Sequence, residues 1–249
     1  MLRRTYLVPL LVAVLVGVAA PARAQTEVPD DTDTHVSVGY EYRRRIKERL
    51  RGFGDLVYKE RFGPDSRWHT TGGVSYDLAK RFRIEGGLGL YYTHRPDLLD
   101  TFETRLWQAA TVDWPDSPGV VRRFVLHHRF RLEERFRKTE DWDFALRFRY
   151  RLSSSIPLNR KTVEPGVFYL PLKAEVFVPL GDDIEELFTN QARYSAGLGY
   201  VFDKSWTAQL LYTGYRLRDT VDADVRTTEH FIEFRVKSSF RILDLIKGR

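Results

Sequence analysis

The chain has 249 residues, of which 30% are charged and 14% are aromatic, and it has no cysteine. The lack of cysteine excludes disulfides and lipid attachment through a thiol, and the aromatic content excludes a disordered chain. The formal net charge is +6. It falls to +3 without residues 1–24, because 37 basic side chains then remain against 34 acidic ones. So small a charge gives little reason to expect a nucleic-acid partner.

Residues 1–24 have the pattern of a secretory signal peptide. A basic start is followed by an apolar run over residues 6–20 and by the cleavage motif Ala22-Arg23-Ala24. The run is shorter than the about 20 residues that a membrane-spanning helix needs. We therefore expect an exported protein that is cut after Ala24.

Residues 124–137, FVLHHRFRLEERFR, alternate with period two. On one face, five of seven positions are large and apolar, including Phe124, Phe130 and Phe136, whereas the other face is almost entirely charged. On a helix the same apolar residues would scatter around the axis. The alternation predicts a β-strand.

The same period recurs along the chain and predicts about ten strands. Their ranges are 35–45, 67–79, 81–93, 102–114, 124–137, 142–153, 168–179, 192–202, 205–217 and 231–240. Tight turns are expected at 78–82, 114–119 and 202–206, and longer loops at 94–101, 181–187 and 218–228. Residues 49–62 are assigned to a long outer loop. If both termini lie in the periplasm the strand number is even, so twelve is the alternative to ten.

Strand length separates two architectures. Residues 124–136 extend about 40 Å, which a tilt of about 40° reduces to roughly 30 Å, the thickness of a bilayer core. Sandwich strands are usually about 5–6 residues long. Aromatic residues such as Trp68, Trp114 and Trp206 also lie near predicted strand ends, as in an interfacial girdle. The sequence thus favours an all-β, antiparallel, up-and-down transmembrane β-barrel in the outer membrane. The alternative is a soluble periplasmic sandwich or lipocalin-like barrel that binds a ligand.

Several stretches resemble a family of uncharacterised bacterial outer-membrane barrels, the domain of unknown function 2490. They are ETRLWQ (103–108), HRFRLEERF (128–136), RFRYRL (147–152), AEVFV (174–178) and NQARYSAGLGY (190–200). The resemblance covers about the last 150 residues. It implies an outer-membrane barrel and brings no activity, substrate or catalytic residue.

The predicted domain boundaries follow from these assignments. They are a signal peptide over 1–24, a short extension over 25–34, a barrel over 35–241 and a tail over 242–249. The last strand is expected to end at Phe240, and the tail has apolar residues at helical spacing.

The polar faces of the strands place twelve ionisable side chains inside the predicted barrel. They are Glu103, Arg105, His127, Arg129, Arg131, Glu133, Arg135, Arg147, Arg149, Arg151, Glu175 and Arg193. One interpretation is a lattice of arginine–carboxylate pairs that fills a narrow interior. The other is a positive interior that binds or passes small anions, since nine arginines and histidines face three glutamates.

A lipid- or peptide-modifying enzyme is a further alternative. Such an enzyme would use a histidine near carboxylates or a serine, as at His94 or at His127 with Glu133 and Ser195. No motif supports it, and we expect a protein that is not an enzyme, without cofactor or metal. The expected partners are outer-membrane lipid, the barrel-assembly machinery and a small anionic solute.

Overall fold

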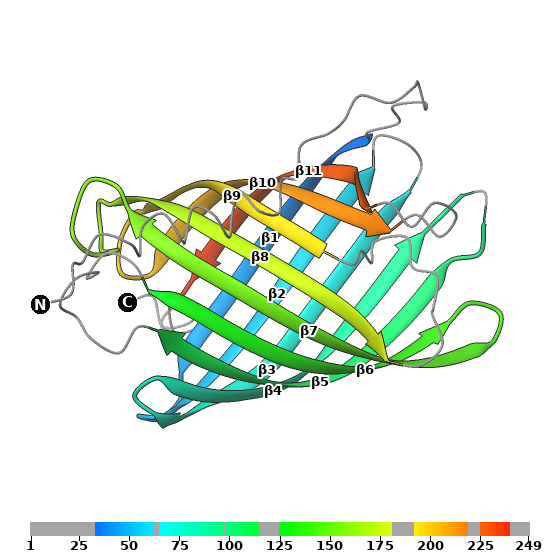
Figure 1. Ribbon diagram of the computed structural model, residues 1–249, viewed down its shortest axis with the longest axis horizontal. Coiled ribbons are helices and arrows are strands. Elements are labelled where there is room, and N and C mark those ends of the chain that lie inside the picture. The colour runs from blue at the N-terminus through cyan, green and yellow to red at the C-terminus, as the bar shows by residue number, and fades with distance from the viewer. Residues whose placement is uncertain are drawn as a thin grey trace, which may run out of the picture. The chain divides into compact units, whose positions relative to one another are not determined.

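A closed barrel is the architecture of the computed structural model, which describes residues 33–61, 65–96, 98–114, 125–180, 192–218 and 225–239 (Figure 1). These ranges contain eleven strands and no helix. The strands are β1 (Asp33–Arg45), β2 (Leu50–Arg61), β3 (Ser66–Ala79), β4 (Phe82–His94), β5 (Thr101–Trp114), β6 (Leu126–Lys138), β7 (Trp142–Pro157), β8 (Phe168–Leu180), β9 (Ala192–Val201), β10 (Trp206–Arg218) and β11 (Val225–Ser238). Within the same ranges, no helix has the length and apolar character to cross a bilayer.

Each strand pairs with its neighbours in the sequence, so the predicted all-β barrel with a meander topology is confirmed. All pairs are antiparallel except β1 with β11, which are parallel, with Asp33 opposite Glu229. The expectation of an even strand number is wrong, and so is the expectation of antiparallel pairing throughout. With eleven strands the first and the last run in the same direction, so they can close the barrel only in parallel.

The assignment of residues 49–62 to an outer loop is also wrong, because β2 occupies Leu50–Arg61. The alternation is hard to see there because Gly52 and Gly54 stand on the outer face, where side chains are apolar in other strands. Phe53 and Val57 stand on the inner face, where polar residues are expected. Pairing with β1 and β3 over the whole length of β2 outweighs the weak pattern.

The end of the barrel at which β1 and β11 begin is called the leading end. The end at which both strands finish is called the trailing end. Of the expected connections, the tight turns at 78–82 and 202–206 lie at the trailing end and the longer loop at 94–101 lies at the leading end. The predictions at 114–119, 181–187 and 218–228 fall mainly outside the described residues. The lengths at the two ends overlap, however, since the connection between β7 and β8 at the trailing end takes residues 158–167. Connection length therefore does not distinguish the ends. The predicted signal peptide, Phe240 and the tail lie outside the described residues.

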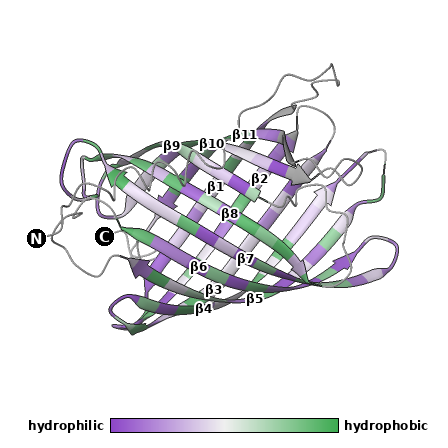
Figure 2. Cartoon of the chain, viewed as in Figure 1, coloured by the Kyte–Doolittle hydropathy of each residue, from purple (hydrophilic) through white to green (hydrophobic). Residues whose placement is uncertain are grey.

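The distribution of polar and apolar side chains over the two faces of the barrel wall is the reverse of that in a protein with an apolar core. Among the described residues, 23 buried side chains are polar or charged and 11 are hydrophobic. Apolar residues such as Leu210, Leu198 and Phe234, which are neighbours on β10, β9 and β11, are about half exposed on the outside. Figure 2 shows this as green and purple alternating along the strands. The inner face is thus polar and the outer face apolar.

Exposed tryptophans mark both ends of the outer face. Trp68 and Trp142 lie at the leading end of β3 and β7, and Trp114 and Trp206 lie at the trailing end of β5 and β10. The fifth tryptophan, Trp107, points inward and is buried. Indole rings with one polar edge suit a boundary between apolar and aqueous surroundings.

A close approach of β3 and β4 requires glycine on the inner face. Gly73 and Gly87 are opposite each other, and the rings of Phe53 and Trp107 meet over them with centroids 5.7 Å apart. A Cβ on Gly87 would lie 2.3 Å from the carbonyl oxygen of Gly72 and 2.6 Å from the indole of Trp107. The two glycines make room for the rings from the neighbouring strands.

We expect Gly87→Ala to lower the free energy of unfolding by about 1–3 kcal/mol, because backbone and ring must both move. Gly86→Ala is the matched control, since a Cβ there faces outward and meets only the Trp107 carbonyl oxygen at 3.7 Å. Urea unfolding in detergent, followed by heat-dependent gel mobility, measures both. Equal midpoints for the two variants would contradict the close packing.

Candidate functional site

The barrel encloses a cavity of about 630 Å³ that opens at the trailing end. Its exposed lining residues Arg43, Ser155 and Lys204 all lie at that end. Toward the leading end the lining residues Lys59 and Arg67 are buried. The described part of the interior is therefore a pocket that opens toward one end and is packed toward the other.

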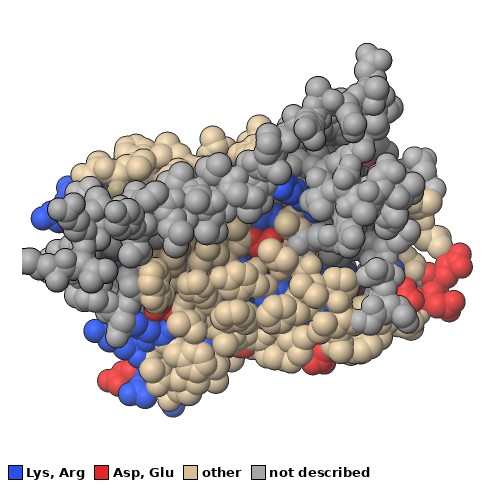
Figure 3. All heavy atoms as spheres, in the orientation of Figure 1, with Lys and Arg blue, Asp and Glu red and all other residues tan. Residues whose placement is uncertain are grey.

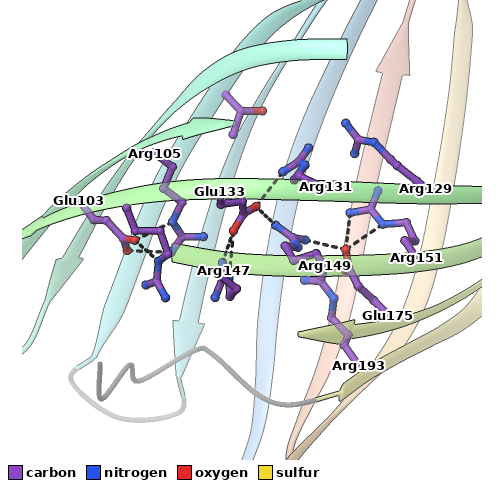
Figure 4. Close-up of polar contacts among 12 residues, drawn as sticks. Glu103, Arg105, Arg129, Arg131, Glu133, Arg147, Arg149, Arg151, Glu175 and Arg193 are labelled. Carbon is purple, nitrogen blue, oxygen red and sulfur yellow. Dashed lines mark hydrogen bonds and ion pairs between the residues drawn. The ribbon is translucent and has the colours of Figure 1, made fainter. Parts of the chain in front are cut away.

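Basic side chains dominate the wall of this cavity. Fifteen lysines and arginines line it, against the five carboxylates of Glu41, Asp55, Glu85, Glu175 and Glu233. In addition, Glu103 and Glu133 lie in the wall behind some of these cations. Figure 4 shows how three of the glutamates, Glu103, Glu133 and Glu175, are shared among arginines from neighbouring strands.

Glu133 on β6 is completely buried and binds three arginines (Figure 4). One oxygen, Oε2, accepts hydrogen bonds from Arg147 at 2.6 and 2.9 Å. The other, Oε1, accepts hydrogen bonds from Arg131 at 3.1 Å and from Arg149. Arg147 and Arg149 come from β7, so this glutamate joins two neighbouring strands.

Glu103 on β5 is the centre of a second group nearer the leading end. Arg105 donates two hydrogen bonds to it, at 2.7 and 2.8 Å, in the bidentate geometry that favours arginine. Arg135 on β6 donates a third at 2.5 Å, and Arg67 on β3 lies 3.6 Å away. All four side chains are buried.

Glu175 on β8 is the centre of a third group and links β7 to β9. It accepts hydrogen bonds from Arg149 at 2.7 Å, from Arg151 at 3.0 Å and from Arg193. Because Arg149 binds both Glu133 and Glu175, the second and third groups form one continuous network. The sequence-predicted arginines of β6, β7 and β9 thus come together around these glutamates.

The two remaining predicted residues have other partners. Arg129 forms an ion pair with Glu85 on β4, with Nε and Oε2 2.6 Å apart. His127 is hydrogen-bonded through Nδ1 to Asp113 on β5 at 2.6 Å. Neither joins the groups around Glu103, Glu133 or Glu175.

Aromatic faces support the arginines between these groups. The guanidinium carbon of Arg105 lies 3.7 Å from the ring centre of Tyr91, and that of Arg131 lies 4.0 Å from Trp107. Phe177 lies 4.8 Å from Arg149 in the same way. Each stacked arginine keeps its N–H groups free to point sideways at a carboxylate.

Cations from β2 and β11 belong to the same interior and were not among the predicted site residues. Arg235 pairs with Glu41 at 2.8 Å and with Glu233 at 2.7 Å, and Lys237 lies 3.1 Å from Glu41. Lys59 on β2 donates a hydrogen bond to the hydroxyl of Tyr215. The sequence does not single out Lys59, because its pattern predicts a loop over residues 49–62. Arg235 and Lys237 lie on the polar face of the predicted strand 231–240, and this position was the sequence signal for an inward side chain.

The histidines do not form the catalytic arrangements considered from the sequence. His127 binds Asp113 and is not hydrogen-bonded to Glu133 or Ser195. His94 lies at the end of β4, where its Nδ1 is 2.8 Å from Asp100. Asp100 lies in the connection that follows β4. Hydrogen bonds from the Tyr92 hydroxyl and the Arg95 amide lower the pKa of its carboxyl group below the usual value. This exposed pair caps a loop.

We expect Glu133→Gln to destabilise the barrel by about 3 kcal/mol or more, because it leaves the guanidinium groups around it short of a buried counter-charge. Glu134→Gln is the matched control, since this neighbour lies on the outer face of β6, away from the network. Urea midpoints at two salt concentrations compare the variants. Similar losses for Glu133 and Glu134 would show that the network does not hold the wall together.

One curated protein shares a short stretch with this chain. A segment of 59 residues, 22% of the chain, is 34% identical to part of the valine–tRNA ligase of Sphingopyxis alaskensis. The chain spans only 6% of the length of that enzyme. A likeness of this extent carries no function to the barrel.

A family model described as "Protein of unknown function (DUF2490)" matches residues 33–226. The match runs from the first residue of β1 into β11, so it includes the first third of the barrel as well as the stretches that carried the resemblance. It covers more than half of the chain. This protein therefore belongs to the DUF2490 family.

Proposed function

We propose that this protein is an outer-membrane β-barrel whose basic interior binds small anions. The observation that carries the proposal is the excess of fifteen basic side chains over five carboxylates around one cavity. A cavity of about 630 Å³ is of the size that proteins use for small molecules, about 300–1,000 Å³. Enclosed positive charge strengthens attraction for an anion, because little water screens it.

The two faces of the wall support placement in a membrane. A barrel in water would turn its apolar side chains inward, whereas here the interior is charged and the outside is apolar. Figure 3 shows an outer surface over the strands that is mostly free of charged atoms, with basic and acidic groups toward the ends. Lipid would cover this surface. The barrel-assembly machinery is the expected partner for insertion, since the chain is predicted to be exported.

The arginine–glutamate groups and the anion site are compatible with each other. Glu103, Glu133 and Glu175 neutralise part of the positive charge and brace the wall. Cations nearer the trailing end, such as Arg43 and Lys204, form no ion pair among the described residues. The packed half therefore stabilises the barrel, and the open half supplies the surplus charge for binding.

We expect Leu210→Arg to lower the stability of the barrel in lipid vesicles by about 2 kcal/mol or more, because an outward arginine near the middle of a strand must enter the bilayer. The exposed Leu98, in the connection after β4, provides the matched control as Leu98→Arg. Urea unfolding from vesicles compares the two. In a soluble barrel an exposed substitution changes stability by only about 0.5 kcal/mol. Equal stability of the two variants, with the protein absent from carbonate-washed membranes, would overturn the membrane placement.

For the anion site, we expect saturable binding of sulfate by the purified barrel in detergent, weakened several-fold by salt. Arg43→Gln combined with Lys204→Gln should weaken binding because both cations line the open end. Lys47→Gln combined with Lys80→Gln is the control of equal net charge, since these turn residues do not line the cavity. Equilibrium dialysis with labelled sulfate measures all three proteins. Absence of saturable binding in the unsubstituted protein would refute the proposal.

A further inference from the structure

Lys173 is a cavity cation whose neighbours on the two adjacent strands carry no charge. It lies on the inner face of β8 and lines the cavity. Its register neighbours on the same face are Ser153 on β7 and Ser195 on β9. Both are small hydroxyl side chains, so Lys173 has no charged neighbour directly beside it on either strand.

Lys173 also lacks an ion pair among the described residues, although many other cations in the barrel have one. Arg235, Lys237, Glu41 and Arg151 line the same cavity, and three of these four are positive. The single carboxylate, Glu41, already pairs with Arg235 at 2.8 Å and with Lys237 at 3.1 Å. Lys173 is therefore the surplus cation of this group.

The groups around Lys173 match the chemistry of a phosphate. An ammonium group supplies three N–H donors and a compact charge, which is how lysine commonly binds phosphate. The hydroxyl of Ser153, which also lines the cavity, can donate to a further oxygen. A phosphate monoester carries about −1.5 to −2 charges at neutral pH and three acceptor oxygens. A singly charged carboxylate would use fewer of these donors and balance less of the charge.

The ends of the barrel differ in charge in a way that favours access from the trailing end. The described connections at that end contain seven basic and three acidic residues, whereas those at the leading end contain one basic and four acidic residues. An anion is attracted to the trailing end, where the cavity opens, and repelled from the other.

We propose that Lys173, together with Ser153, binds the phosphate group of a phosphate monoester that enters from the trailing end. The inference rests on the proposed anion-binding function and assigns a ligand class and a binding residue to it. Two sources carry the same group: a small water-soluble organic phosphate and the headgroup of a phosphatidate-type lipid. The rest of the cavity offers space for the part of the ligand that carries the phosphate.

The test compares Lys173→Met with Lys161→Met, the same change at an exposed turn residue that does not line the cavity. Lys173→Arg keeps the charge and should restore part of the binding. The probes are phenyl phosphate and short-chain phosphatidic acid, titrated calorimetrically into the whole protein in detergent. Heat-dependent gel mobility verifies that each variant is folded.

We expect Lys173→Met to weaken binding of at least one probe about ten- to a hundredfold, as for the loss of a hydrogen bond to a charged group. Lys161→Met should bind as the unsubstituted protein does. Binding of phenyl phosphate would identify a soluble ligand, and binding of phosphatidic acid alone would identify a lipid. If sulfate binds but neither phosphate probe depends on Lys173, the inference fails while the anion-binding function stands. If neither sulfate nor phosphate binds, both fail.

Discussion

Each carboxylate inside this barrel has to be shared, because the inward faces of the strands carry more arginines than glutamates. Glu133 and Glu175 each bind three arginines, and Arg149 belongs to both sets. The partners come from neighbouring strands, so the groups connect β6, β7, β8 and β9 across the wall. A small globular protein holds its strands together through an apolar core. Here the same task falls to charge pairs, since the apolar side chains face outward.

The parts of the fold that could be predicted from the sequence are those where one face of a strand is uniformly apolar. β6 and β7 satisfy this condition, and arginines from the polar faces of these strands, such as Arg131 and Arg149, line the cavity. β2 does not satisfy it, because glycines occupy two outer positions and Phe53 and Val57 face inward. The alternation pattern depends on the residues of one strand alone. Phe53, in contrast, faces inward because its ring contacts Trp107 of β5. That contact depends on strands distant in the sequence.

The partners of the predicted site residues could not be predicted from the sequence for the same reason. Arg129 finds its carboxylate in Glu85, 44 positions earlier in the chain, and Arg135 shares Glu103 with Arg67. Spacing along one strand identifies which side chains point inward. It does not tell which of them meet, because that depends on the stagger between strands. Lys173 was overlooked because Tyr169, Pro171 and Phe177 share its face of β8, so that face does not look polar.

The parallel contact between β1 and β11 determines when the barrel can become complete. Asp33 and Glu229 are 196 positions apart, and the hydroxyl of Tyr40 is hydrogen-bonded to that of Ser238 across the same contact. Every other strand pair joins neighbours in the sequence and can form locally, whereas this one needs both extremes of the described chain. It also uses the parallel ladder, which is slightly less stable per residue than the antiparallel one. The growing sheet thus keeps two free edges until its last strand has been made. The longer closure takes, the longer these edges can pair with a wrong strand.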